Sequence, residues 1–271
     1  MTGSSPKMNV LVVSSEVLAT AASLLGQAQR IALLTGAGIS AESGIPTFRD
    51  SLTGLWQRFD AVDLATPEAF QRDQALVWGW YEWRRMQVMR AQPNPGHRAL
   101  AELARRVPAC TVMTQNVDDL HERAGSREVI HLHGSLHTPR CFACARAYLF
   151  AEGMIPDEPE GGRRLAPPSC PHCGGNIRPG VVWFGETLPE AAWCQAEAAV
   201  DACDVLLAIG TSGLVYPAAG LPENARQLGK PVIVIGPNPT GIDEVASHLL
   251  RGQAGEILPG LMKRMFQNQA R

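Results

Sequence analysis

The sequence lacks the features that would place the protein in a membrane or on nucleic acid. Its 271 residues contain no apolar run near the roughly 20 residues that a membrane-spanning helix requires. The first nine residues also lack the basic start and long apolar middle of a signal peptide. The formal net charge is only −2, so there is no overall basic surface to bind nucleic acid. We therefore expect a cytoplasmic protein without membrane or direct nucleic-acid partners.

Internal repeats, low-complexity tracts and the composition of a disordered chain are also absent. Hydrophobic residues make up 45% of the chain and charged residues 18%, which is usual for a folded domain. A length of 271 residues suits one large domain, or a full domain that carries a smaller inserted module. The sequence is therefore compatible with a compact enzyme that has a substantial core.

Several runs rich in Val, Ile and Leu, each followed by turn residues, indicate buried parallel strands. The three strongest runs are residues 31–35, 205–209 and 232–235, and residues 110–114 and 181–183 are further candidates. Helix-length segments separate these runs, as is typical of a parallel sheet that is covered on both faces. The sequence therefore predicts an α/β fold with a Rossmann-like, doubly wound parallel sheet.

Two helices have recognisable starts. Thr66-Pro67-Glu68 places an N-cap residue before a proline at the first helical position, and Asn94-Pro95-Gly96 has the same pattern. Helices are therefore expected to begin at these two points.

Two segments do not follow the alternation of strands and helices. Residues 52–92 are rich in tryptophan and helical in pattern, and residues 139–179 are rich in Pro, Gly and Cys. We predict that both are insertions that form a smaller lobe. The α/β domain would then comprise residues 1–51, 93–138 and 180–271.

A glycine-rich segment follows the first predicted strand. Residues 36–41 fit the pattern G-x-G-x-x-A, which lets a backbone approach a pyrophosphate at the start of a helix. A tight turn without any ligand would use the same glycines. The position directly after a strand favours nucleotide binding.

The acidic residue that a dehydrogenase needs is missing. A hydride-transferring enzyme would show a second strand that ends in Asp or Glu about 20 residues further on, but the chain enters the helical insertion instead. The loops at residues 210–212 and 236–238 follow apolar strands, where ligands gather in α/β sheets. We expect these loops to supply the contacts to the nucleotide ribose.

Seven cysteines are an odd number, and their spacing does not suggest a disulfide framework. Cys110, Cys194 and Cys203 stand alone in apolar or helical contexts. A free cysteine in such a context usually serves as a small core residue.

The other four cysteines form two C-x-x-C pairs in the second insertion. Cys141 pairs with Cys144, and Cys170 pairs with Cys173. Two such pairs can place four thiolates tetrahedrally around Zn²⁺, with no open position for water. A redox dithiol or unconnected surface thiols are the alternatives, and His172 could replace one ligand. We predict a structural zinc ion and therefore a zinc-binding insertion.

The order of several motifs resembles that of the sirtuins, and the match extends over most of the chain from about Ile31. The matching motifs are residues 36–40 with 44–49, then 114–118, 132–134, 182–186, 210–212, Asn238 and residues 252–256. This resemblance implies that the α/β domain binds NAD. It also implies a protein-lysine deacylase that consumes NAD as a co-substrate.

The chemistry of the sirtuins implies roles for three residues. In these enzymes the acyl-lysine oxygen attacks the nicotinamide ribose carbon of NAD, which releases nicotinamide and leaves an imidate joined to ADP-ribose. A histidine acts as general base, and hydrolysis yields free lysine and O-acyl-ADP-ribose. Carried over by position, the base is His133, and Asn116 and Asp118 are the further catalytic residues. A histidine near its ordinary pKa suits this task, whereas His97, His131 and His137 are expected to have no catalytic role.

The resemblance also implies a set of residues that bind NAD, among them a loop that closes over it. These residues are Gly36, Ala37, Gly38, Ser40, Glu42, Pro46, Thr47, Phe48, Arg49, Gln115, Asn116, Val117, Asp118, His133, Gly210, Thr211, Ser212, Gly236, Asn238 and Ala254.

The helical insertion contains a candidate acyl-binding pair. Tyr81 and Arg84 are three residues apart, which puts them on one face of a helix. A guanidinium and a phenol can together bind a carboxylate, although a surface arginine beside a packed tyrosine is the alternative. The stretch 63–70 followed by this pair is similar to class III sirtuins, in which a small alanine, here Ala65, leaves room for the acyl group. We therefore predict a preference for succinyl, malonyl or related acidic acyl groups over acetyl.

The substrate peptide is expected to dock as an added strand between residues 184–186 and 213–216, as sirtuin substrates do. The residues that the resemblance assigns to this contact are Val182, Phe184, Gly185, Glu186 and Val215. Main-chain pairing tolerates many sequences, so specificity for flanking residues should be loose.

Three other functions remain compatible with the sequence. The chain could be a deacetylase without acidic preference, or it could transfer ADP-ribose to a protein nucleophile. From a different class, it could be a sensor module that binds NAD or ADP-ribose without turnover. Measurements of nicotinamide release and of O-acyl-ADP-ribose separate these possibilities.

Overall fold

The computed structural model describes residues 14–47, 59–150, 157–159 and 162–269. Within these residues, six parallel strands form one sheet in the order β3-β2-β1-β6-β7-β8. The strands are β1 (Arg30–Thr35), β2 (Ala109–Thr114), β3 (Ile130–His131), β6 (Val205–Ile209), β7 (Val232–Ile235) and β8 (His248–Leu250). The predicted doubly wound parallel sheet is confirmed.

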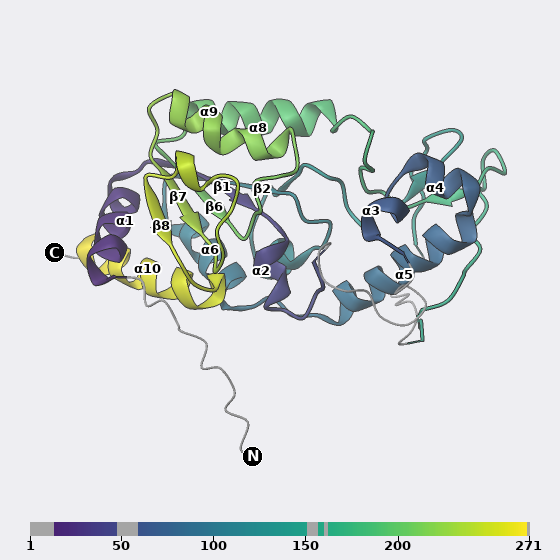
Figure 1. Ribbon diagram of the computed structural model, residues 1–271, viewed down its shortest axis with the longest axis horizontal. Helices are drawn as coiled ribbons and strands as arrows, with labels where there is room; N and C mark the ends of the chain where they lie inside the picture. Colours follow the sequence, from purple (N-terminus) through teal and green to yellow (C-terminus); the bar gives the residue numbers. More distant parts are fainter. Residues whose placement is uncertain (1–13, 48–58, 151–156, 160–161, 270–271) are drawn as a thin grey trace, which may run out of the picture.

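Helices cover both faces of the sheet (Figure 1). One face packs against α1 (Ser15–Gln27), α6 (Pro95–Arg106) and α10 (Ala254–Gln269), and the other against α8 (Glu190–Ala202) and α9 (Leu221–Gln227). Successive residues of a strand point to opposite faces. In β1, Ile31 and Leu33 join the first core, while Ala32 and Leu34 join the second. This double burial explains why the strands are apolar throughout.

The predicted helix starts are confirmed by their capping bonds. The Thr66 hydroxyl accepts a hydrogen bond from the Ala69 amide at the start of α4 (Pro67–Arg72). The Asn94 side chain accepts from the Gly96 amide at the start of α6 and also donates to the Ile39 carbonyl. Asn94 therefore ties α6 to the segment that follows β1.

The candidate strand at residues 181–183 is not confirmed. Val181 forms only an isolated bridge with Gly134, and the Val182 amide donates to the His133 carbonyl. The segment therefore crosses the chain that follows β3 and does not extend the sheet. It still has a structural role, because it fixes the backbone at His133.

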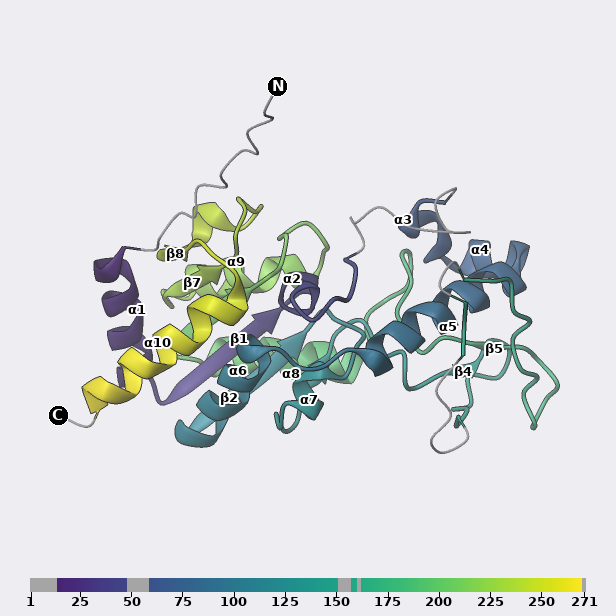
Figure 2. The same cartoon turned by 90° about the horizontal axis from the view of Figure 1, so that it is seen from below.

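A smaller lobe lies beyond one end of the sheet (Figures 1 and 2). It contains α3 (Ala61–Leu64), α4, α5 (Gln74–Arg90) and the antiparallel pair β4 (Arg140–Cys141) and β5 (Ile177–Arg178). One hydrophobic core joins both insertions, since Phe70 and Trp80 belong to the same cluster as Cys141 and Ile177. Helix α5 is buried on nearly all sides from Leu76 to Met86, so even its polar residues face protein.

Four short elements complete the fold of the residues that the structure describes. They are α2 (Ala37–Ala41), α7 (Leu120–Arg123), and the 3-10 helices η2 (Ala218–Gly220) and η3 (Asp243–Val245). None of the described helices is both long and apolar enough to cross a membrane.

Candidate active site

The candidate site lies where the parallel strands end. The loops after β1, β2 and β6 meet at one edge of the sheet, because parallel strands point their carboxyl ends the same way. Helix α2 lies at this edge, between the sheet and the smaller lobe (Figures 1 and 2). Ligands of open α/β sheets usually bind at such an edge.

The glycine-rich segment packs backbone against backbone on the loop after β6. A Cβ atom on Gly36 would lie 2.8 Å from Cα of Thr211, and one on Gly38 would lie 2.7 Å from the Gly210 carbonyl oxygen. The Gly36 amide donates to the Ile209 carbonyl, and the Gly38 amide donates to the Gly210 carbonyl. The glycines therefore have a packing role, which the interpretation as a ligand-free turn also predicts.

Three buried polar side chains join this segment to the loop after β2. The Ser40 hydroxyl donates to Oδ2 of Asp118 at 2.8 Å, and Nδ2 of Asn116 donates to the Ser40 hydroxyl at 3.0 Å. The Asn116 amide group also reaches the Gly36 carbonyl at 3.2 Å. Burial raises the pKa of the Asp118 carboxyl, although the Leu120 amide and the Ser40 hydroxyl lower it in part. The predicted residues at positions 40, 116 and 118 thus form one network.

Gln115 connects the loops after β2 and β6. Its side-chain amide donates to the Thr211 hydroxyl at 2.8 Å, and its backbone amide donates to the Thr35 carbonyl. Its own carbonyl faces Nδ1 of His133 at 3.0 Å. Gln115 therefore brings the predicted general base to the same sheet edge as the glycine-rich segment.

The surroundings of His133 fix which nitrogen carries its proton. A carbonyl oxygen only accepts hydrogen bonds, so Nδ1 must carry the hydrogen that faces Gln115. The lone pair then lies on Nε2. Burial lowers the pKa of His133, against the opposing effect of the Gln115 carbonyl. The ring is therefore neutral at pH 7, as a general base must be.

Other predicted NAD-binding residues make contacts within the protein. The Glu42 carboxylate accepts from the Gly255 amide at 3.0 Å, beside buried Ala254 at the start of α10. The Asn238 carbonyl accepts from Arg251, and the Gly236 amide donates to the Leu250 carbonyl. These residues hold the loops together, but no hydrogen bond joins them to His133 or Asn116 within the described residues.

The remaining predicted residues fall into three groups. Four of them are half-buried: Ala37 at the first position of α2, and Pro46, Thr47 and Ser212 on loops. The Val117 carbonyl accepts a hydrogen bond from the Leu136 amide. Phe48 and Arg49 lie outside the described residues.

A buried pair of histidines behind the site was not assigned from sequence. Nε2 of His121 lies 2.9 Å from the Thr35 hydroxyl, which donates to the Thr114 hydroxyl at 2.9 Å. The rings of His121 and His97 meet edge to face with centroids 5.0 Å apart. Burial lowers the pKa of His97 to about 4 and that of His121 to about 3. In the sequence, the threonines that end two apolar strands, Thr35 and Thr114, were the feature that could have indicated buried polar partners here.

The predicted acyl-binding residues lie together in the smaller lobe. Ala65, Tyr81 and Arg84 are all buried. The Arg84 guanidinium lies 5.2 Å from the centre of the Trp80 ring, and its charge opposes the rise in the pKa of Tyr81 that burial causes. Nε1 of Trp183 donates to the Tyr81 hydroxyl at 3.0 Å. Sequence reasoning missed Trp183, although it lies inside a motif that was used.

The predicted peptide-binding segments have exposed apolar side chains. Phe184 is 42% exposed, and Leu214 and Tyr216, which flank the half-buried Val215, are 60% and 68% exposed. The Phe184 amide donates to the Ala65 carbonyl, which ties this segment to the acyl-binding residues. Gly185 has a positive φ of 86°, which favours glycine at this turn.

The Glu186 carboxylate is engaged within the protein. It forms a bidentate ion pair with buried Arg178, in which Nη1 lies 2.5 Å from Oε1 and Nη2 lies 2.9 Å from Oε2. It also accepts from the Trp183 backbone amide at 2.8 Å. Hydrogen bonds from Arg178 and Trp183, with the Arg178 charge, outweigh the effect of burial and lower the pKa of Glu186. The carboxylate therefore shapes the loop that contains it.

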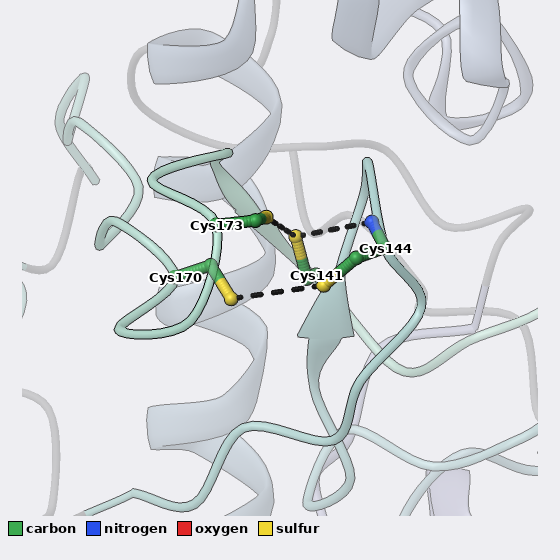
Figure 3. A group of neighbouring side chains, drawn as sticks. All are labelled: Cys141, Cys144, Cys170 and Cys173. Atoms are coloured by element: carbon green, nitrogen blue, oxygen red, sulfur yellow. Dashed lines mark hydrogen bonds between the residues drawn. The ribbon is translucent and has the colours of Figure 1, made fainter.

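The four paired cysteines form a compact cluster (Figure 3). All four sulfur atoms lie within 4.8 Å of one another, with Cys141 to Cys173 at 3.5 Å and Cys144 to Cys170 at 3.8 Å. A tetrahedral zinc site with Zn–S bonds of about 2.3 Å places its sulfurs roughly 3.8 Å apart. The donor set and its spacing therefore fit zinc, and exposed His172 is not needed as a ligand.

The closely spaced sulfur atoms change the pKa values of one another's thiols. The Cys144 backbone amide, 3.4 Å from the Cys141 sulfur, lowers the pKa of that thiol to about 6. The Gly175 amide lowers the pKa of Cys173, but its sulfur neighbours Cys144 and Cys141 outweigh this effect and raise it to about 12. Four thiolates so close together require a positive ion to neutralise them.

Comparisons with known sequences extend over most of the chain. The Sir2 family profile matches residues 36–217. NAD-dependent protein deacylase 1 of Pseudomonas aeruginosa is 59% identical over 245 residues, which are 90% of this chain and 97% of the relative. An NAD-dependent protein deacylase of Methylococcus capsulatus is 56% identical over 256 residues, which are 94% of this chain and 98% of the relative.

Solved structures share the fold. A Sir2 homologue in complex with NAD aligns with a TM-score of 0.85 and 42% identity, over 98% of this chain and 97% of that chain. A Sir2 protein bound to a myristoylated histone peptide aligns with a TM-score of 0.73 and 31% identity, over 95% of this chain and 99% of that chain.

Proposed function

The chain belongs to the Sir2 family, and we propose that this NAD-dependent protein deacylase prefers lysines that carry succinyl, malonyl or related acidic acyl groups. The observation that carries the preference is the burial of Tyr81 and Arg84 on one face of α5. A buried guanidinium beside a phenol suits a carboxylate and offers an acetyl group no comparable partner.

NAD is the co-substrate, and the sheet edge suits its ribose and pyrophosphate. When bound, NAD supplies a ribose carbon that the acyl oxygen can attack, with nicotinamide as the leaving group. We assign the ribose contacts to Gln115, Asn116 and Asp118, whose polar groups gather beside the glycine-rich segment. Thr211 joins them through its hydrogen bond with Gln115.

We assign the general base to Nε2 of His133. The Gln115 carbonyl holds the proton on Nδ1, and burial keeps the ring neutral. Nε2 can therefore accept a proton from a ribose hydroxyl and return it later in the reaction. The expected products are nicotinamide, free lysine and O-acyl-ADP-ribose.

We assign the peptide backbone to the space between residues 184–186 and 213–216. Exposed Phe184 and Leu214 would border an extended peptide there. A solved Sir2 protein that holds a myristoylated histone peptide supports acylated peptides as ligands of this fold. The Phe184–Ala65 hydrogen bond would place such a peptide next to the acyl-binding residues.

The four-cysteine cluster fits a structural zinc ion in the smaller lobe. Four thiolates fill a tetrahedral shell and leave no position for a reacting water. We therefore assign zinc to the stability of the lobe and the chemistry to the sheet edge.

A comparison of acyl peptides tests the proposed preference. Acetyl, succinyl, malonyl and glutaryl forms of one peptide are assayed with NAD, for the wild type and for Arg84→Met. Loss of one partner of a charged hydrogen bond costs a few kcal/mol, so we expect kcat/KM for succinyl-lysine to fall roughly 10- to 1000-fold. The acetyl peptide should lose much less. An equal loss for both peptides, or a wild type that does not favour acidic acyl groups, would contradict the proposal.

A further inference from the structure

The acyl-binding tyrosine has a buried hydrogen-bond donor of its own. Nε1 of Trp183 lies 3.0 Å from the Tyr81 hydroxyl oxygen, and the two side chains come from segments 102 residues apart. Both residues are almost fully buried, at 1% and 3% exposed. An indole nitrogen can only donate a hydrogen bond, so the Tyr81 oxygen must be the acceptor.

This contact limits what the phenol can do. A tyrosine hydroxyl has one proton, and its oxygen accepts hydrogen bonds through its lone pairs. With Trp183 donating to the oxygen, the proton of Tyr81 is directed to an acceptor other than Trp183. Burial raises the pKa of Tyr81 despite the opposing effects of Arg84 and Trp183, so the proton is present at neutral pH. The phenol is therefore set up as a donor.

The indole is in turn held on three sides. The backbone amide of Trp183 donates to Oε2 of Glu186 at 2.8 Å, and the Arg178 guanidinium lies 3.5 Å from the centre of the Trp183 ring. The Arg178 and Glu186 side chains are joined by their bidentate ion pair, and Arg178 also donates to the Val181 carbonyl at 3.0 Å. Phe70 packs on the indole with ring centres 5.4 Å apart. The direction of the indole N–H is thus fixed by the protein.

We propose that Trp183 is a positioning residue for acyl specificity, because its N–H makes Tyr81 a donor toward the carboxylate of an acidic acyl group beside Arg84. Arg178 and Glu186 act indirectly, because they hold the indole of Trp183 in place. This inference rests on the proposed preference for acidic acyl groups. An acetyl group has no carboxylate to accept the phenol proton, so the arrangement favours acidic acyl groups only.

The test compares succinyl and acetyl peptides for the wild type and Trp183→Phe. Loss of one directing hydrogen bond should lower kcat/KM for the succinyl peptide roughly tenfold, mainly through a higher KM. The acetyl peptide should change by less than about threefold. Phenylalanine is also smaller than tryptophan, so a second variant controls for size. It has benzothienylalanine at position 183, which keeps the shape of the indole but has sulfur in place of the N–H group. It should show the same selective loss. Trp193→Phe on α8, which packs against a different core from that of Tyr81, should retain the wild-type ratio of the two activities.

A double-mutant cycle shows whether Trp183 acts through Tyr81. In a Tyr81→Phe background, which lacks the hydroxyl, Trp183→Phe should cause no further loss of succinyl selectivity. Additive losses would overturn the inference, as would an unchanged ratio in both position-183 variants of a selective wild type. A wild type that treats both peptides alike would instead overturn the proposed function.

Discussion

At the sheet edge, the predicted base His133 and the glycine-rich segment are placed by backbone groups, whereas in the smaller lobe the predicted acyl-binding Tyr81 is placed by other side chains. His133 is oriented by the Gln115 carbonyl, and the glycine-rich segment packs directly on the backbone of the loop after β6. Tyr81 is oriented by Trp183, and Trp183 by Arg178 and Glu186. The difference suggests that the chemistry is tied to the fold, while acyl selectivity can change through single side chains.

The two regions also differ in what stabilises them. The strands of the sheet are buried between two layers of helices, with cores on both faces. The described part of the smaller lobe has one core, and Cys141 and Cys170 of the metal cluster belong to it. A lobe of this size gains much of its stability from a bound metal.

Zinc removal should have the larger of two effects on stability and should separate the two regions. We expect about one zinc ion per active chain, because four thiolates form a closed site. Chelation, or Cys141→Ala, should unfold the smaller lobe and lower activity at least about tenfold, since its core also contains Trp183 and Tyr81. Hydrogen exchange should rise in residues 139–179 while β1, β2 and β6 stay protected.

Cys194→Ser is the matched control, because Cys194 is exposed on α8 and outside the cluster. It should retain both zinc and activity. Fully active protein with less than half an equivalent of zinc would argue against a structural site.

Acid should give a smaller effect, and it should act on the sheet edge. Burial holds the pKa of His97 at about 4 and that of His121 at about 3, whereas an unfolded histidine titrates near 6.5. Between pH 6.5 and about 4, the unfolded chain therefore binds more protons than the folded chain, and stability falls as the pH falls. The expected loss is on the order of 1.4 kcal/mol per pH unit for each histidine.

His131 opposes this trend, because its hydrogen bond and ion pair with Glu122 outweigh burial and raise its pKa. Denaturant unfolding of the wild type and His97→Leu at pH 7.5 and 5.5 measures the balance. The variant should show a weaker pH dependence than the wild type. Parallel pH dependences would exclude a buried neutral histidine at position 97.

The sequence predicted the sheet well because its strands have a simple signature. The runs at residues 31–35, 110–114, 205–209 and 232–235 became β1, β2, β6 and β7 with ends within one residue. Burial on both faces makes such strands continuously apolar, so they are visible without any partner. Strands β3 and β8, with two and three residues, are too short to give an apolar run.

The grouping of the candidate residues was predictable where they lie in short motifs, and not where it depends on pairs that are distant in the sequence. Asn116, Asp118 and His133 were predicted from local motifs, and the structure brings all three to the same sheet edge. The Trp183–Tyr81 bond and the Thr35–His121 contact join residues 102 and 86 positions apart. Only tertiary packing determines such partners, so the composition of neither segment could reveal them.

The central claim is that His133 drives the transfer of an acyl group from lysine to ADP-ribose. Mass spectrometry of a reaction with NAD and a succinyl-lysine peptide tests it directly, for the wild type and His133→Ala. The wild type should form nicotinamide, free lysine peptide and O-succinyl-ADP-ribose in equal amounts, and the folded variant should be at least about 100-fold slower. Near wild-type turnover by His133→Ala, or nicotinamide release with ADP-ribosylated protein in place of O-succinyl-ADP-ribose, would contradict it.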